Sequence, residues 1–197
     1  MPGLTLAVEG VVDAAVLQRV LDTEGFDTYA VYGLRGKTNL DASLVAFNNA
    51  AQFSPWLVVR DLDHDDACGA ALAKTLMPAP GKWMRFHIAV RETEAWLLAD
   101  PESLARYLRV RRALVPADPE GLSDPKQALV NLARRSRSQT IVADMVPRPG
   151  LSADVGPAYT ARVSEFALQH WRPDIAAEGS PSLRRCIERV RELAAYP

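Results

Sequence analysis

Acidic side chains follow two apolar segments at positions where their carboxylates could meet. Glu9 ends the first apolar segment, and Asp61, Asp63 and Asp65 follow the segment at residues 55–59. If these segments are neighbouring strands, the carboxylates converge and raise one another's pKa. A hard divalent cation relieves such repulsion, and all-oxygen ligands favour magnesium, manganese or calcium. We therefore expect a metal site containing Glu9, Asp61 and Asp63. Asp65 is a further candidate ligand.

A simpler explanation exists for the last acids of this run. Asp65 and Asp66 precede a helical segment that we expect to begin at Ala67. Acidic side chains there would cap the helix and favour its dipole. This explanation is accepted for Asp66. For Glu9, Asp61 and Asp63, their positions at strand ends favour a metal-binding role over that of solvated loop acids.

Two further acids, Glu92 and Glu94, follow the apolar segment at residues 84–90. Either could supply a second-metal ligand or a general base, since two-metal phosphoryl transfer needs shared carboxylates. The alternative is that one of them caps the following helix. We favour a site role for Glu94 and leave Glu92 open between the two.

A short basic loop follows the second apolar segment. Residues 33–37 read Gly-Leu-Arg-Gly-Lys, so Arg35 and Lys37 are bracketed by glycines. Basic side chains beside a bound metal suit a phosphate backbone, because they neutralise its charge. The glycine spacing is not that of a P-loop. A turn with two solvated bases remains the alternative.

Basic clusters at residues 106–112 and 134–137 could line a path for nucleic acid, with Arg109 and Arg112 as candidate contacts. The competing explanation is electrostatic, because cations near helix C-termini complement the helix dipole.

The elements that must position these residues alternate along the first hundred positions. Strands are expected at residues 4–8, 26–32, 55–59 and 84–90. Helical segments are expected at residues 11–23, from Asn39 or Asp41 to 52, at 67–77 and from 94. This alternation predicts an α/β fold with a parallel sheet of four strands in the order 2-1-3-4, covered by helices. Functional groups then gather at the carboxyl ends of the strands.

The second half lacks strand signals and predicts a helical extension. Helices are expected from residues 101 and 125, at 159–171 and at 182–195, the last with Ser180 as its cap and Pro181 at its first position. We therefore divide the chain into an α/β domain, 1–100, and a helical part, 101–197, docked as one unit.

Composition limits the classes of protein that remain. The chain has 197 residues, 48% hydrophobic and 24% charged, which is the balance of a folded globular protein. Its net charge of −1 combines an acidic first half with a basic second half, in keeping with a cation site beside an anion-binding surface. No apolar run is long enough to cross a membrane, and no export signal is evident, so a cytoplasmic location is expected.

Two motifs resemble those of TOPRIM domains, which occur in topoisomerases, bacterial primases and nucleases of the OLD type. Residues 8–13, Val-Glu-Gly-Val-Val-Asp, resemble the first TOPRIM motif, and residues 61–65 resemble its Asp-x-Asp motif. The resemblance covers about residues 4–98. It implies that the glutamate and the aspartate pair coordinate magnesium for phosphoryl transfer on nucleic acid. A topoisomerase is not expected, because no glycine follows Asp65 directly and no strand-passage tyrosine is evident.

Three other stretches are similar to RloB-like and related bacterial TOPRIM proteins, namely residues 91–100, 156–160 and 180–183. Such proteins often accompany ATPases in phage-defence or restriction-linked gene clusters. The resemblance implies a nuclease that uses Mg²⁺ or Mn²⁺, with DNA as the favoured substrate. An ATPase partner and oligomerisation are both compatible with it.

Two classes of function remain open at the level of sequence. In a nuclease, the metal would activate water for attack on a phosphodiester while Lys37 or an arginine steadies the developing charge. In a binding or regulatory subunit, the same fold would serve a partner, and the near-neutral net charge favours this alternative. A phosphatase of the HAD type ranks last, because its Asp-x-Asp motif normally follows the first strand.

Overall fold

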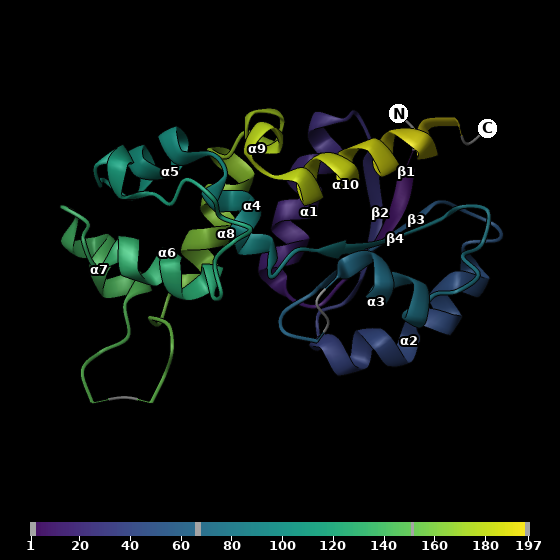
Figure 1. The fold of residues 1–197 in the computed structure, drawn as a ribbon, viewed down its shortest axis with the longest axis horizontal. Helices are drawn as coiled ribbons and strands as arrows, with labels where there is room; N and C mark the ends of the chain where they lie inside the picture. Colours follow the sequence, from purple (N-terminus) through teal and green to yellow (C-terminus); the bar gives the residue numbers. More distant parts are fainter. Residues whose placement is uncertain (1–2, 66–67, 151, 196–197) are drawn as a thin grey trace.

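The structure is a computed structural model that describes residues 3–65, 68–150 and 152–195. Its centre is a four-stranded, all-parallel sheet in the order β2-β1-β3-β4 (Figure 1), which confirms the predicted fold class and strand order. The strands are β1 (Gly3–Val8), β2 (Asp27–Gly33), β3 (Trp56–Asp61) and β4 (Met84–Ala89). The order places β1 beside β3, as the expected site requires.

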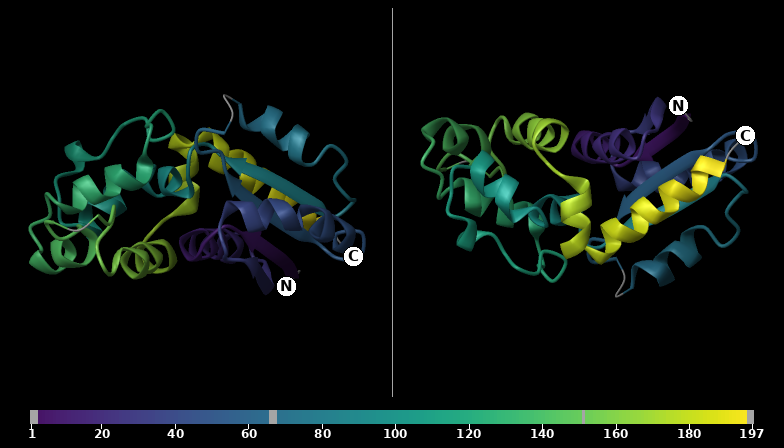
Figure 2. Two further views of the ribbon diagram at one scale, coloured as in Figure 1. Left: turned by 90° about the horizontal axis from the view of Figure 1, so that it is seen from below. Right: turned by 90° about the horizontal axis from the view of Figure 1, so that it is seen from above.

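Helices cover both faces of the sheet (Figure 2). Helices α1 (Val11–Thr23) and α10 (Pro181–Glu192) lie on one face, and α2 (Lys37–Ala50) and α3 (Gly69–Leu76) lie on the other. The strand side chains alternate between these layers. Leu6 and Leu57 join the apolar cluster on the α1 side, whereas Ala7 and Val58 join the cluster on the α2 side. The strands β1 and β3 at the centre of the sheet therefore bury both of their faces, as parallel sheets do, whereas the edge strand β2 stays largely exposed.

Two helix starts differ from the sequence expectation. Helix α2 begins at Lys37, after Gly36 with φ 82°, so neither Asn39 nor Asp41 is its cap. The expectation was wrong because the glycine supplies a left-handed turn that ends the basic loop early. Helix α3 begins at Gly69, two residues after the expected start. Ala67 and the proposed cap Asp66 lie outside the described residues.

Beyond β4, every regular element of the described residues is a helix. These elements are α4 (Thr93–Leu98), α5 (Pro101–Tyr107), α6 (Pro125–Ala133), α7 (Gln139–Met145), α8 (Tyr159–Gln169), α9 (Pro173–Gly179) and α10, with single 3₁₀ turns at Arg112–Leu114 and Leu193–Ala195. One apolar cluster contains Leu4 and Leu6 from the sheet together with Trp96 and Phe166 from the helices and Trp171 from the link between α8 and α9. The two halves therefore share a single core on this side of the sheet.

Helix α10 returns from the helical half and runs along the sheet (Figure 2). The Ser180 hydroxyl accepts a hydrogen bond from the Leu183 N–H, and Pro181 is the first helical residue, which confirms the predicted cap. No helix in the described part of the chain is long and apolar enough to cross a membrane.

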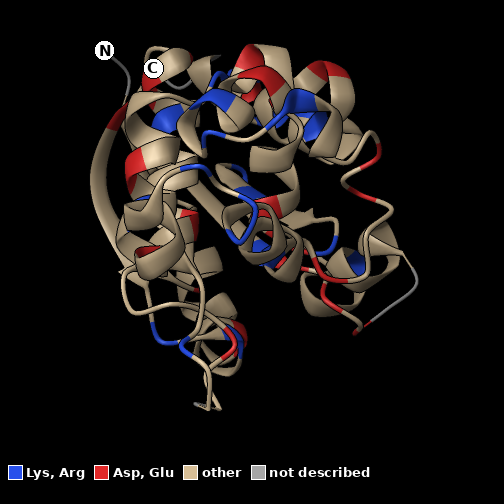
Figure 3. Ribbon diagram, turned by 90° about the vertical axis from the view of Figure 1, so that its left-hand side faces the viewer, with Lys and Arg blue, Asp and Glu red and all other residues tan. Residues whose placement is uncertain are grey.

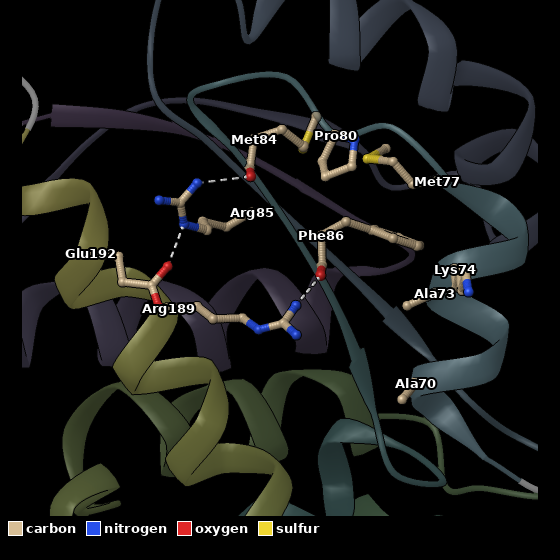
Figure 4. Close-up of a pocket in the computed structure, with 10 residues that line it drawn as sticks. All are labelled: Ala70, Ala73, Lys74, Met77, Pro80, Met84, Arg85, Phe86, Arg189 and Glu192. Atoms are coloured by element: carbon tan, nitrogen blue, oxygen red, sulfur yellow. Dashed lines mark hydrogen bonds and ion pairs between the residues drawn. The ribbon is translucent and has the colours of Figure 1, made fainter.

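Strand β4 forms one edge of the sheet, and α10 protects it (Figure 4). The Arg189 guanidinium donates to the Phe86 carbonyl at 2.5 Å, and Arg85 pairs with Glu192 at 2.9 Å. A cavity of about 640 Å³ remains between α3 and α10. These two arginines occupy the outward side of β4, where another strand would otherwise add.

Candidate metal centre

The carboxyl ends of β1 and β3 bring two of the predicted residues together. Glu9 follows β1 directly, and Asp61 is the last residue of β3. The Asp61 N–H donates to Glu9 Oε1 at 2.9 Å. The two side chains whose spacing first indicated a site are therefore neighbours at one edge of the sheet.

A tighter group of carboxylates forms around Asp61 with partners from two helices. One carboxylate oxygen from each of Asp13, Asp61 and Glu94 lies within 4.8 Å of the others. Asp13 comes from the first turn of α1, and Glu94 comes from the first turn of α4. Such a set of hard oxygen ligands suits a divalent cation, and the three residues could hold one.

Backbone and hydroxyl donors fix the orientation of this group. Thr93 links two of its members, because its hydroxyl donates to Asp13 Oδ1 at 2.5 Å and its N–H donates to Asp61 Oδ1 at 3.0 Å. The N–H of Gly10 donates to the other oxygen of Asp13 at 2.8 Å. Preorganisation of this kind holds ligand carboxylates in place before a cation arrives.

Burial and mutual repulsion raise the pKa values of these acids. Burial raises the pKa of both Glu9 and Glu94 to about 7. Burial also raises the pKa of Asp61 well above its ordinary value, and the nearby charges of Asp13 and Glu94 add to the effect. Crowded carboxylates with raised pKa values are the electrostatic condition that a divalent cation relieves.

The helical half closes the site with a cation and a hydroxyl. Lys126 Nζ, at the start of α6, lies 3.8 Å from Glu94 Oε1. The Tyr159 hydroxyl, at the start of α8, donates to the same oxygen at 3.3 Å. Burial lowers the pKa of Lys126, but the nearby carboxylates of Glu94 and Glu92 raise it, and the pKa lies above its ordinary value. Glu9 and these side chains line a cavity of about 510 Å³.

Asp63 and Asp65 belong to a different network. Lys37 Nζ lies 2.7 Å from Asp63 Oδ2 and 2.9 Å from Asp65 Oδ2. Arg60 pairs with Asp65 at 2.6 Å and with Asp41 at 2.8 Å. Neither aspartate is among the three residues of the tight group. The structure thus separates the Asp-x-Asp pair, with Asp61 in the cluster and Asp63 bound to a lysine.

The remaining candidates lie in several places. The Glu92 carboxylate accepts a hydrogen bond from the Lys126 backbone N–H at 3.0 Å, so it binds the first turn of α6 beside the cluster. Arg35 is exposed in the loop after β2. Arg109 and Arg112 are exposed in the helical half, outside the acid-lined cavity.

Sequence reasoning missed three residues of the site. Asp13 carried a usable signal, because it stands four residues after Glu9 in the first turn of a predicted helix. That position places its carboxylate at the same sheet edge. No local sequence signal marks Lys126 or Tyr159, because only the tertiary packing of α6 and α8 brings them to the strand ends.

Comparison of the chain with protein-family models, curated proteins and solved structures finds no match.

Proposed function

We propose that this protein is a divalent-cation-dependent hydrolase of nucleic-acid phosphodiesters, a nuclease of the TOPRIM type. The observation that carries the proposal is the group of Asp13, Asp61 and Glu94, whose oxygens lie within 4.8 Å at the carboxyl end of a parallel sheet. Metal sites of phosphoryl-transfer enzymes are built from carboxylates of this kind. The TOPRIM resemblance supplies the substrate class. DNA as the substrate, Mg²⁺ or Mn²⁺ as the metal, and an ATPase partner in phage defence belong to the same proposal.

The residues of the cavity would have separate roles in the reaction. Asp13, Asp61 and Glu94 would hold the cation, which supplies charge neutralisation at the phosphodiester. Glu9 has a pKa near 7, so it can accept a proton from the attacking water at neutral pH. Lys126 reaches the cavity from the helical half and would stabilise the negative charge that develops on the phosphate.

A cleavage assay with single-residue variants tests this proposal. Purified protein is incubated with labelled single- and double-stranded DNA and RNA in Mg²⁺, in Mn²⁺ or in EDTA. We expect cleavage that needs the metal and that Asp61→Asn abolishes. Asp22→Asn is the matched control, because Asp22 is an exposed acid on α1. Metal-independent cleavage, or equal activity of Asp61→Asn and the wild type, would contradict the proposal.

One observation favours a non-catalytic binding subunit instead. Lys126 already places a positive charge 3.8 Å from Glu94 and could balance part of the cluster without a metal. In that case the acids and the lysine would join the two halves of the chain. Titration calorimetry with Mn²⁺ separates the two functions, because the subunit would bind no metal at this site. Asp61→Asn would then leave the heat of mixing unchanged.

A further inference from the structure

A second cavity, lined by arginines, lies in the helical half. It has a volume of about 430 Å³ and is lined by Arg106, Arg109, Arg111 and Arg137, together with Ala105 and Val110. It shares no lining residue with the acid-lined cavity. All four arginines are exposed, so their guanidinium groups are accessible to a ligand.

Backbone geometry brings the arginines together from two segments. After α5, Arg109 adopts a left-handed conformation with φ 54°, which turns the chain so that Arg111 lies on the same cavity as Arg106. The Arg137 N–H donates to the Arg109 carbonyl at 3.3 Å, so the stretch between α6 and α7 lies beside this turn. A non-glycine residue in this conformation is uncommon and is retained only where the surrounding structure requires it.

The charge of this cavity is largely uncompensated. Arg106 pairs with Glu102 at 3.1 Å. Within the part of the chain that the structure describes, the side chains of Arg109, Arg111 and Arg137 take part in no ion pair or hydrogen bond. The dipole of α5 attracts cations to its C-terminal end, but it does not account for Arg137, which comes from another segment. Three like charges around one cavity repel unless an anion binds between them.

We propose that this arginine cavity binds a phosphate group of a nucleic acid. Guanidinium groups match phosphate oxygens because each offers paired N–H donors, and they stay charged at any physiological pH. The choice of nucleic acid as the ligand rests on the proposed function. In that case the arginine cavity would hold the nucleic-acid backbone at a point away from the reacting centre. Either an internal phosphodiester or a terminal phosphate presents the chemistry required.

Binding in EDTA tests the cavity without any contribution from metal chemistry. The probe is a short single-stranded DNA labelled at its 3′ end, prepared with a 5′-phosphate or with a 5′-hydroxyl, and the readout is fluorescence anisotropy at fixed salt. The test variant is Arg111→Gln/Arg137→Gln. The matched control is Arg134→Gln/Arg135→Gln, which removes two exposed arginines beside Arg137 that do not line the cavity.

We expect the test variant to bind about tenfold more weakly or worse, because it removes two charge-assisted contacts. The control should lose no more than about threefold, the effect of bulk charge on a screened polyanion. A loss confined to the 5′-phosphorylated probe assigns the cavity to a terminal phosphate, and an equal loss for both probes assigns it to an internal one.

Equal weakening in the test and control variants would overturn the inference, as would a wild type that binds neither probe. The result is distinct from the fate of the proposed function. If metal-dependent cleavage is absent while the test variant alone loses affinity, the hydrolase proposal fails and the phosphate site stands.

Discussion

At the scale of single residues, the tight group of carboxylates shares only Asp61 with the expected ligand set. Sequence reasoning chose Glu9, Asp61 and Asp63, whereas the group closest to a metal geometry is Asp13, Asp61 and Glu94. Asp63 was a reasonable choice, since it follows the same strand as Asp61. Its backbone adopts φ 50°, and its carboxylate meets Lys37. A left-handed residue cannot be recognised from an Asp-x-Asp pattern, so the sequence could not show which aspartate faces the cavity.

This difference gives the first prediction. Asp13→Asn keeps the size of the side chain and one of its two accepting oxygens but removes its charge, so it should abolish the rise in melting temperature caused by millimolar Mn²⁺. Asp63→Asn should keep most of that rise, because Asp63 pairs with Lys37 rather than with the cluster. Differential scanning fluorimetry with and without the metal measures both. If Asp63→Asn abolished the rise and Asp13→Asn kept it, the ligand would be Asp63, as the sequence indicated, and not Asp13.

A second prediction concerns the pH dependence of stability without metal. Glu94 has a pKa near 7 in the folded chain, raised by burial from its ordinary 4.5. Between these values the folded chain keeps a proton that the unfolded chain has released, so the free energy of unfolding falls as the pH rises. The loss is complete above pH 7 and amounts to about 3 kcal/mol for this group.

The variant Glu94→Gln should remove that contribution. It should be more stable than the wild type at about pH 8 and equally stable at about pH 4, because the neutral glutamic acid resembles the amide. Urea unfolding in EDTA at a series of pH values measures the difference. A stability difference that does not change with pH would show that Glu94 stays ionised in the folded chain.

At the scale of elements, β4 carries a buried histidine with the opposite behaviour. His87 packs against Trp96, and its Nε2 has no hydrogen-bond partner among the described residues. Burial, together with the charges of Arg189 and Arg185, lowers its pKa to about 3. Below pH 6.5 the unfolded chain therefore binds a proton that the folded chain excludes, and stability falls as the pH falls.

We expect His87→Phe to resist acid better than the wild type. Between pH 6.5 and pH 4 the wild type should lose about 3 kcal/mol more than the variant. Urea unfolding over this range measures the slopes, and Glu94→Gln serves as the comparison because its effect has the opposite sign. Parallel curves for the wild type and His87→Phe would mean that the histidine is not held neutral by the fold.

The elements themselves were predictable to different degrees. Helix α1 occupies the expected residues, and the cap of α10 is the expected Ser180, because periodic apolar residues and a Ser-Pro start are local signals. Helices α7 and α9 were not expected, since each has only seven residues and little room for a periodic pattern. Their stability comes from packing in the shared core.

At the scale of the whole molecule, the candidate site depends on both halves of the chain. Glu9 and the carboxylates of the tight group come from strand ends and helix starts in the first hundred residues, while Lys126 and Tyr159 come from the helical half. This contact between the halves could not be predicted from the sequence, because no local pattern places the start of α6 against the carboxyl ends of β1 and β3. The halves with opposite net charge therefore meet at the site through a lysine that faces carboxylates; Figure 3 marks the basic and acidic residues along the ribbon.

The fourth prediction tests this junction. Lys126→Gln removes the positive charge beside Glu94 and Glu92, so the metal-free protein should be less stable at about pH 8, where the carboxylates are ionised. Stabilisation by Mn²⁺ should be larger than in the wild type, since the cation no longer competes with the lysine. Lys74→Gln, at an exposed position on α3, is the control. If both variants melt like the wild type, Lys126 does not balance the cluster.

Helix α10 also determines when the sheet can be completed during synthesis. Residues 181–192 cover a face built by residues 3–8 and 84–89, so a ribosome must add about ninety residues after β4 before that face is closed. Until then the edge of β4 is open to pairing with other nascent chains. We expect chains arrested before residue 181 to be digested by a protease within β4, whereas chains extended far enough to release α10 from the ribosomal tunnel resist it. The sheet in the first half of the chain therefore reaches its final structure only after the second half has been synthesised.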